Sequence, residues 1–120
     1  MALRILLVED DVPVARIAVR LLGRLGHDVT HCVCGADALA ALDGSPWQLV
    51  MMDADLPDTT GDRLLAAILE RRPAQRVVVA SGHGARAILD AALVARVTSF
   101  LPKPYGLDEL RACLVAVEAG

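Results

Sequence analysis

Four acidic residues stand at positions where they could do chemistry. Glu9 and Asp10 follow a short apolar run near the start of the chain, Asp53 ends another apolar run, and Asp55 comes two residues later. Carboxylates that lie close together repel each other and raise each other's pKa. A divalent cation cancels that repulsion, and hard oxygen ligands suit Mg²⁺. The pattern therefore predicts a Mg²⁺ site built from Glu9, Asp10 and Asp53.

A hydroxyl and an ammonium group complete a chemically sensible set. Ser81 ends a third apolar run, and Lys103 follows a fourth. Both can stabilise the charge of a phosphoryl group, whose transfer depends on positioning, charge stabilisation and an in-line nucleophile. A carboxylate can be that nucleophile and form an acyl phosphate. Asp53 is the candidate because it ends the most apolar strand.

Five short apolar runs alternate with five helical patterns, which is typical of a parallel sheet covered on both faces. The expected strands are 4–8, 27–33, 47–53, 76–81 and 99–102. The expected helices are 12–26, 35–44, 59–72, 85–95 and 107–119. Ligands bind at the carboxyl edge of such a sheet, so we expect Asp10, Asp53, Ser81 and Lys103 to converge there.

The first helix has clear signals at both ends. Asp11 can cap its start, Pro13 suits the first turn, and Gly26 ends it. Its expected apolar stripe consists of Ile17, Leu21, Leu22 and Leu25.

Composition narrows the class of protein. A chain of 120 residues is the size of one domain, and its net charge of −3 argues against a basic nucleic-acid surface. The apolar run near the start is too short for a signal peptide or a membrane span, so we expect a cytoplasmic protein. A metal could be held by His27, His31, Cys32 and Cys34, but a flat strand does not supply the tetrahedral spacing that zinc needs. Buried cysteine is the simpler interpretation.

Four segments together resemble the receiver domain of two-component response regulators, over essentially the whole chain. They are ILLVEDD, LVMMDADLPDTTG, VVVASG and FLPKP, in this order. The resemblance implies a flavodoxin-like, doubly wound α/β fold with a five-stranded parallel sheet of order 2-1-3-4-5. It also implies that residues 1–120 form a single receiver domain without an output domain.

The resemblance assigns roles in metal binding to four residues. Asp10 and Asp53 would bind Mg²⁺ directly, Glu9 through water, and Asp55 through its backbone carbonyl.

It assigns the phosphoryl contacts in the same way. Ser81 and Lys103 would contact the phosphoryl oxygens, and the backbone amides of Ala54 and Gly82 would assist. The Lys103–Pro104 peptide would be cis, which proline tolerates.

The implied function is a signalling switch and not a conventional enzyme. A histidine kinase or phosphotransfer protein would donate to Asp53, and Ser81 and Phe100 would then reshape the face of the fourth helix, fifth strand and fifth helix. That face could also form a homodimer. We expect no direct contact with nucleic acid or membrane.

Alternatives stay open at this point. A Mg²⁺-dependent phosphohydrolase of the haloacid-dehalogenase type shares some of these residues, although there the paired aspartates end the first strand. A binding module that never needs phosphate is a third possibility. The chain could be a stand-alone receiver, part of a larger regulator or part of a hybrid kinase.

Single residues also have simpler interpretations. Phe100 could be a core aromatic, Asp55 and Asp58 could be plain turn residues, and His83 could be exposed. The apolar helix around Ile88 could be buried or could be an interaction face.

Overall fold

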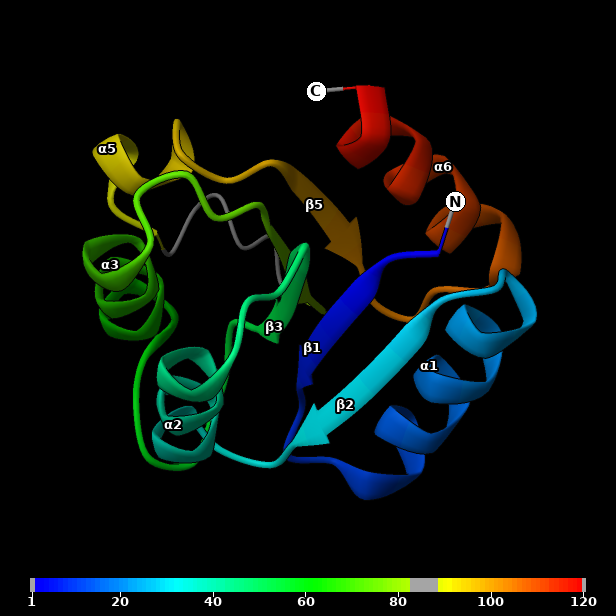
Figure 1. The fold of residues 1–120 in the computed structure, drawn as a ribbon, viewed down its shortest axis with the longest axis horizontal. Coiled ribbons are helices and arrows are strands. Elements are labelled where there is room, and N and C mark those ends of the chain that lie inside the picture. Colours follow the sequence, from blue (N-terminus) through cyan, green and yellow to red (C-terminus); the bar gives the residue numbers. More distant parts are fainter. Residues whose placement is uncertain (1, 83–88, 120) are drawn as a thin grey trace.

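The computed structural model describes residues 2–82 and 89–119 and shows one parallel five-stranded sheet (Figure 1). Its order is β2-β1-β3-β4-β5, which confirms the predicted order. The strands are β1 (Arg4–Val8), β2 (Asp28–Cys32), β3 (Leu49–Asp53), β4 (Val77–Ser81) and β5 (Ser99–Pro102). β2, β3 and β4 are each one or two residues shorter than expected, but all five strands occur where the apolar runs predicted them.

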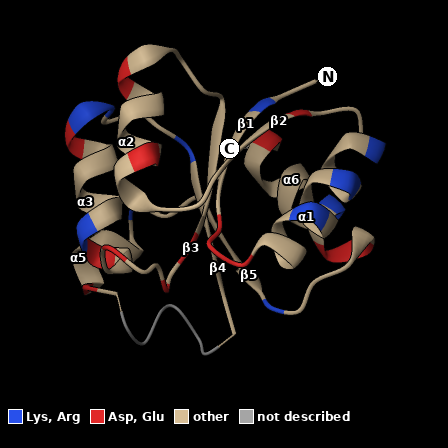
Figure 2. Ribbon diagram, turned by 90° about the horizontal axis from the view of Figure 1, so that it is seen from below, with Lys and Arg blue, Asp and Glu red and all other residues tan. Residues whose placement is uncertain are grey.

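Helices cover both faces of the sheet (Figure 2). The described helices are α1 (Val12–Arg24), α2 (Gly35–Gly44), α3 (Gly61–Arg71), α5 (Ala91–Val94) and α6 (Leu107–Ala119). α1 and α6 lie on one face, and α2, α3 and α5 lie on the other. The arrangement explains the sequence pattern. The inner strands are covered on both faces and are apolar throughout, whereas each long helix is apolar mainly on the side that packs against the sheet.

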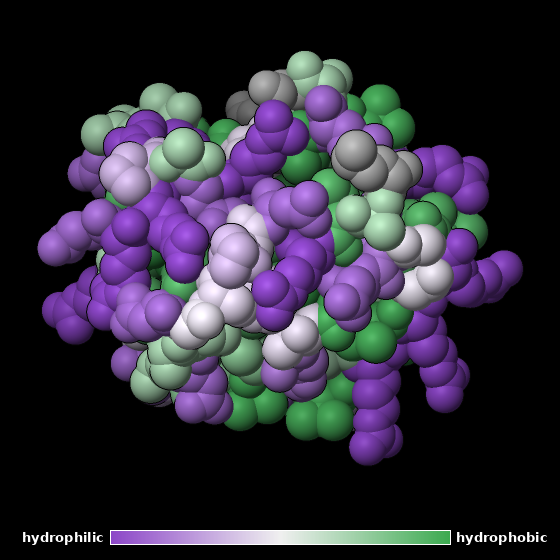
Figure 3. All heavy atoms as spheres, in the orientation of Figure 1, coloured by the Kyte–Doolittle hydropathy of each residue, from purple (hydrophilic) through white to green (hydrophobic). Residues whose placement is uncertain are grey.

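The sheet separates two apolar clusters. Leu6, Val50 and Met52 face α2 and α3, whereas Leu7 and Met51 face α1 and α6. β1, β3 and β4 are almost completely buried, as their unbroken apolar runs predict, whereas β2 at the edge is half-buried. On the face seen in Figure 3, apolar side chains lie between hydrophilic ones.

α1 begins where predicted and ends at Arg24, two residues before the end of the predicted range. Asp11 accepts a hydrogen bond from the Val14 amide over 3.1 Å, and Gly26 has the positive φ of 89° that favours glycine after a helix. The predicted stripe is partly wrong, because Ile17 is 56% exposed. The buried positions of α1 are Ala15, Ala18 and Leu22. Small alanines therefore take the places closest to the sheet, and the stripe is rotated away from Ile17.

Within the described part of the fourth predicted helix, over 85–95, Leu89 and Asp90 are not helical, and positions 85–88 of this prediction lie outside the described residues. α5 begins at Ala91, capped by Asp90, whose side chain accepts from the Ala92 amide over 2.9 Å. Leu89 lies outside the helix and is buried against the α2/α3 face. His83 and Ile88, for which alternatives were open, lie outside the described residues.

None of the helices in the described ranges is long and apolar enough to cross a membrane.

Candidate functional site

The carboxyl edge of the sheet gathers the predicted residues. β3 ends at Asp53, β4 ends at Ser81, Glu9 directly follows β1, and Lys103 directly follows β5. The parallel register aligns these ends, because Val8 pairs with Met52, Asp53 with Ala80, and Ser81 with Pro102. Four segments that are far apart in sequence therefore contribute to one site, as the alternation of strands and helices predicts.

Lys103 bridges two of the carboxylates. Its Nζ donates to Glu9 Oε1 and, over 3.1 Å, to Asp53 Oδ2. The Lys103 side chain is 20% exposed, against 4% for Glu9 and 10% for Asp53. Two acids are thus held nearly out of water beside one ammonium group, where charge interactions are stronger than at the surface.

The electrostatics of the site reflect this crowding. Burial raises the pKa of Glu9 to about 7, and the charge of Asp53 adds to the rise, although the hydrogen bond from Lys103 opposes it. Burial alone would lower the pKa of Lys103, but hydrogen bonds and charge from Glu9 and Asp53 outweigh it, so the pKa is raised. The acidic residues at the edge of the sheet therefore favour a bound cation. The ammonium group of Lys103 neutralises only part of their negative charge.

Glu9, Asp10 and Asp53 form one potential metal-binding group. One carboxylate oxygen from each lies within 4.8 Å of the others, and within the described ranges this is the one group of three acids, histidines or cysteines so close together. Asp10 is exposed, so the group opens to solvent on its side. Three hard oxygen donors with access to water fit Mg²⁺. In the described part of the chain, the alternative metal site at His27, His31, Cys32 and Cys34 is not formed.

The loop after β3 holds Asp53 in place. The Asp55 amide donates to Asp53 Oδ1 over 3.2 Å, and Asp55 also forms an antiparallel bridge with Thr60. Thr60 caps α3, because its hydroxyl accepts from the Arg63 amide over 3.3 Å. The carboxylate of Asp55 is not part of the acidic group. The predicted role of Asp55 is as a metal ligand through its backbone carbonyl, and that role stays a prediction.

The remaining predicted residues lie near the same edge. The Lys103–Pro104 peptide is cis, as predicted. Ser81 is buried, and Phe100 is half-buried against the α2/α3 cluster. The Ala54 amide donates to the Ala80 carbonyl over 3.0 Å, so a contact from this amide to a phosphoryl group requires that bond to be exchanged. Gly82, next to Ser81, is exposed.

Two contacts near the site were not predicted. Asp58 accepts hydrogen bonds from the Gly35 and Ala36 amides at the start of α2. His31 Nε2 lies 2.7 Å from the Glu9 carbonyl, to which it donates. Each contact joins segments more than 20 residues apart, and no local sequence pattern indicates such a pair.

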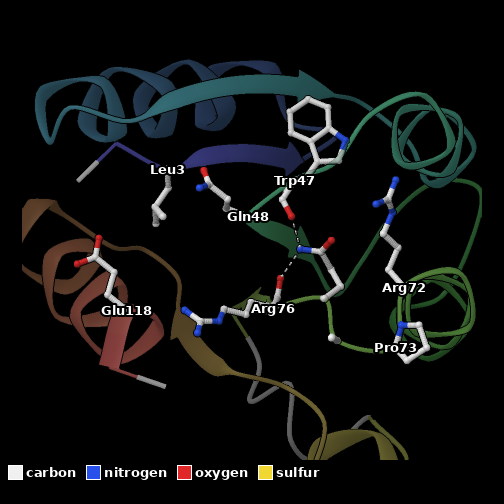
Figure 4. Close-up of a pocket in the computed structure, with 9 residues that line it drawn as sticks. Leu3, Trp47, Gln48, Arg72, Pro73, Arg76 and Glu118 are labelled. Atoms are coloured by element: carbon white, nitrogen blue, oxygen red, sulfur yellow. Dashed lines mark hydrogen bonds between the residues drawn. The ribbon is translucent and has the colours of Figure 1, made fainter.

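A cavity of about 630 Å³ lies at the opposite edge of the sheet (Figure 4). Its lining includes Leu3, Gln48 and Arg76, which directly precede β1, β3 and β4. The polar groups drawn there bond mainly to the backbone: Gln75 Nε2 donates to the Trp47 and Arg76 carbonyls over 3.1 Å each. None of the predicted site residues lines this cavity.

Comparisons with known proteins identify the family of this chain. A family model described as the response regulator receiver domain matches residues 5–115. The transcriptional regulatory protein TcrA of Mycobacterium tuberculosis is 34% identical over 95% of this chain, which covers 45% of TcrA. The response regulator receiver protein CpdR of Brucella abortus is 33% identical, with 89% of each chain covered.

A solved structure agrees with the fold as well. The CheY-like response regulator receiver domain from Methylobacillus flagellatus superposes with a TM-score of 0.87 at 26% identity, over 98% of this chain and 99% of that one. Sequence, fold and the convergence of Glu9, Asp10, Asp53 and Lys103 lead to the same conclusion: the chain belongs to the family of response regulator receiver domains.

Proposed function

We propose that this protein is a phosphorylation-driven switch whose acceptor is Asp53. The observation that carries the proposal is the contact of Lys103 with both Asp53 and Glu9, because it unites the ends of three strands around one carboxylate. Asp53 is buried on its strand side, and the open side of the site lies toward Asp10. A phosphodonor can therefore approach from solvent while the protein holds the nucleophile still.

The reaction is a transfer from phosphohistidine, supplied in the cytoplasm by a histidine kinase or a phosphotransfer protein. A carboxylate oxygen of Asp53 attacks phosphorus in line. The P–N bond breaks, its electron pair returns to the imidazole, which takes a proton from water, and the new O–P bond makes an acyl phosphate. The Asp55 amide orients the attacking carboxylate, and Lys103 moves its charge toward the phosphoryl oxygens.

Mg²⁺ would be held by Asp10, Asp53 and the Asp55 carbonyl, with Glu9 acting through water. When bound, it neutralises the acids and the transferring phosphoryl oxygens. The carboxylates of Glu9 and Asp53 would attract the cation. The Asp11 amide orients Glu9, because it donates to Glu9 Oε2 over 3.3 Å.

The output is a change in the face that includes α5, β5 and α6. Ser81 ends β4, and two residues upstream Val79 pairs with Phe100 on β5. A movement of Ser81 toward a phosphoryl group is therefore transmitted to a strand on which Phe100 packs against the α2/α3 cluster. This is a population shift driven by a local charge. A homodimer through this face belongs to the same proposal.

The phosphodonor docks on the apolar surface beside the site. A groove of about 270 Å³ is lined by Val14 and Ile17 of α1 and by Lys103, Pro104 and Tyr105 after β5. Lys103 belongs to both the groove and the site, so a protein seated in the groove has direct access to Asp53. The exposed Ile17 is thereby explained as a contact for a partner.

The test is the mass of the protein after incubation with Mg²⁺ and acetyl phosphate. Wild type should gain the mass of one phosphoryl group, whereas Asp53→Asn and the wild type in chelator should not. An equal gain on Asp53→Asn would overturn the assignment. Sustained turnover of an aryl phosphate would instead support the phosphohydrolase alternative, which the family match disfavours.

A further inference from the structure

The loop between β3 and α3, which follows Asp53, is hydrogen-bonded to the start of α2. Asp58 Oδ1 accepts from the Gly35 amide over 2.9 Å, and Asp58 Oδ2 accepts from the Ala36 amide over 3.0 Å. Amides in the first turn of a helix have no partner within the helix, and a side chain at the N-cap position normally accepts from one of them. The two bonds also lower the pKa of Asp58.

α2 has no cap of its own. Its N-cap position is occupied by Cys34, whose side chain makes no capping hydrogen bond. A thiol is a weak acceptor, so the helix start depends on an acceptor from elsewhere. Asp58, 23 residues away in sequence from Gly35, supplies it.

The loop is also seated closely on that helix. A Cβ added to Gly35 would lie 2.6 Å from Thr59 Cγ2 and 3.4 Å from Asp58 Oδ1. A side chain at this position would require the Thr59 side chain to shift, so the absence of a Cβ at Gly35 lets the loop approach the helix start as it stands. Hydrogen bonds and steric fit thus place the loop in one position.

From there the contacts lead to the acceptor. The loop closes through the bridge between Asp55 and Thr60, and the Asp55 amide donates to Asp53 Oδ1. We propose that Asp58 is a positioning residue, which fastens the loop to α2 and thereby holds the Asp55 amide on the carboxylate of Asp53. This inference rests on the proposed function for its effect on phosphorylation.

Two variants separate positioning from simple stabilisation of the helix. Asp58→Ala removes both the cap and the fastening. The double variant Asp58→Ala with Cys34→Ser restores a capping hydroxyl to α2 itself but leaves the loop unfastened. Asp37→Ala is the matched control, because it removes an exposed acid from the first turn of the same helix.

We expect the double variant to regain most of the thermal midpoint that Asp58→Ala loses. It should still bind Mg²⁺ about tenfold more weakly than wild type by calorimetry, the size of effect that partners of metal ligands have. Hydrogen exchange of the Asp55 amide, followed by NMR without Mg²⁺, should be faster than in wild type. Asp37→Ala should leave the exchange and the Mg²⁺ affinity unchanged.

The double variant decides the inference. Wild-type exchange at Asp55 together with wild-type Mg²⁺ affinity in that variant would overturn it, since Asp58 would then be a helix cap alone. A wild-type protein that neither binds Mg²⁺ nor takes up phosphate would instead defeat the proposed function. The exchange of the Asp55 amide would still decide the role of Asp58.

Discussion

Lys103 and Glu9 form an ion pair although 94 residues separate them in the chain. They meet because β1 and β5 run parallel and end at the same edge of the sheet. Lys103 also contacts Asp53, so one ammonium group serves two buried acids. The site consequently depends on four strands of the sheet, because its residues stand at the ends of β1, β3, β4 and β5.

The charge balance of the site predicts the effect of removing the lysine. Lys103→Met should lower the free energy of unfolding by about 3 kcal/mol at pH 8 without Mg²⁺, because two buried carboxylates lose their partner. The loss should be smaller at pH 5, where Glu9 takes up a proton. Chemical denaturation at both pH values measures it.

Arg111 provides the control for that variant. Its 3.9 Å pair with Asp108 is exposed, so Arg111→Met should change the free energy of unfolding by well under about 1 kcal/mol. Equal losses for the two variants would contradict the charge balance described above.

The raised pKa of Glu9 predicts an unusual pH dependence. Its folded pKa, about 7, lies above the ordinary 4.5, so between these values the native state binds more protons than the unfolded state. Without Mg²⁺, this group therefore makes the free energy of unfolding fall as pH rises through that window, by at most about 1.4 kcal/mol per unit. Glu9→Gln should remove most of this pH dependence of the free energy of unfolding. Asp108→Asn, which changes an exposed acid, should leave it as in wild type.

Mg²⁺ should oppose that trend. A cation binds the deprotonated acids, so the rise in thermal midpoint on adding Mg²⁺ should be larger at pH 8 than at pH 6. A rise of the same size at both pH values would show that Glu9 does not titrate in the metal site.

Two glycines should respond oppositely to the same substitution. A Cβ at Gly61 would lie 3.1 Å from the Ala54 carbonyl oxygen and 3.4 Å from Leu89 Cδ2. Gly61→Ala should therefore push the residue after Asp53 aside and cost about 1–2 kcal/mol of unfolding free energy. Gly23 lies in α1 with nothing within 4 Å of its added Cβ, so Gly23→Ala should stabilise by about 0.5–1 kcal/mol. Thermal denaturation compares the pair.

Ile17 should matter for protein donors and not for small ones. Ile17→Gln should slow phosphotransfer about tenfold from the kinase or phosphotransfer protein that labels wild type fastest, because an apolar contact is lost. Labelling by acetyl phosphate should not change. Val115→Gln is the matched control, since Val115 is similarly exposed, at 61%, but lies on α6 outside the groove. Equal slowing with acetyl phosphate would place the fault in the site itself.

The sequence predicted the sheet well because its inner strands β1, β3 and β4 are buried on both faces. A short unbroken apolar run such as LVMM before Asp53 is typical of a strand buried on both faces. The carboxyl ends of parallel strands lie at a common edge of the sheet. Glu9, Ser81 and Lys103 were therefore placed correctly by topology. The resemblance to receiver domains added their roles and the cis peptide before Pro104, which the apolar pattern alone does not indicate.

The errors lie where the burial or partner of a residue is decided by tertiary contact. Ile17 is more hydrophobic than Ala15 or Ala18, so a periodic stripe favours it, yet close packing of α1 on the sheet selects the small residues. Asp58 reads as a turn residue because its partners at the start of α2 are distant in sequence. The start of α5 at Ala91 follows from the cap at Asp90, which a run of apolar residues conceals.

Lys103 is the sole lysine in the sequence, and so the sole side-chain primary amine. Amine-selective acylation of the chain would thus modify the acidic site at Lys103 and, apart from the α-amino group, no other position. Its raised pKa keeps the amine protonated and unreactive while Glu9 and Asp53 hold it. The rate at which an acylating reagent labels Lys103 Nζ would therefore report how often Lys103 separates from Glu9 and Asp53.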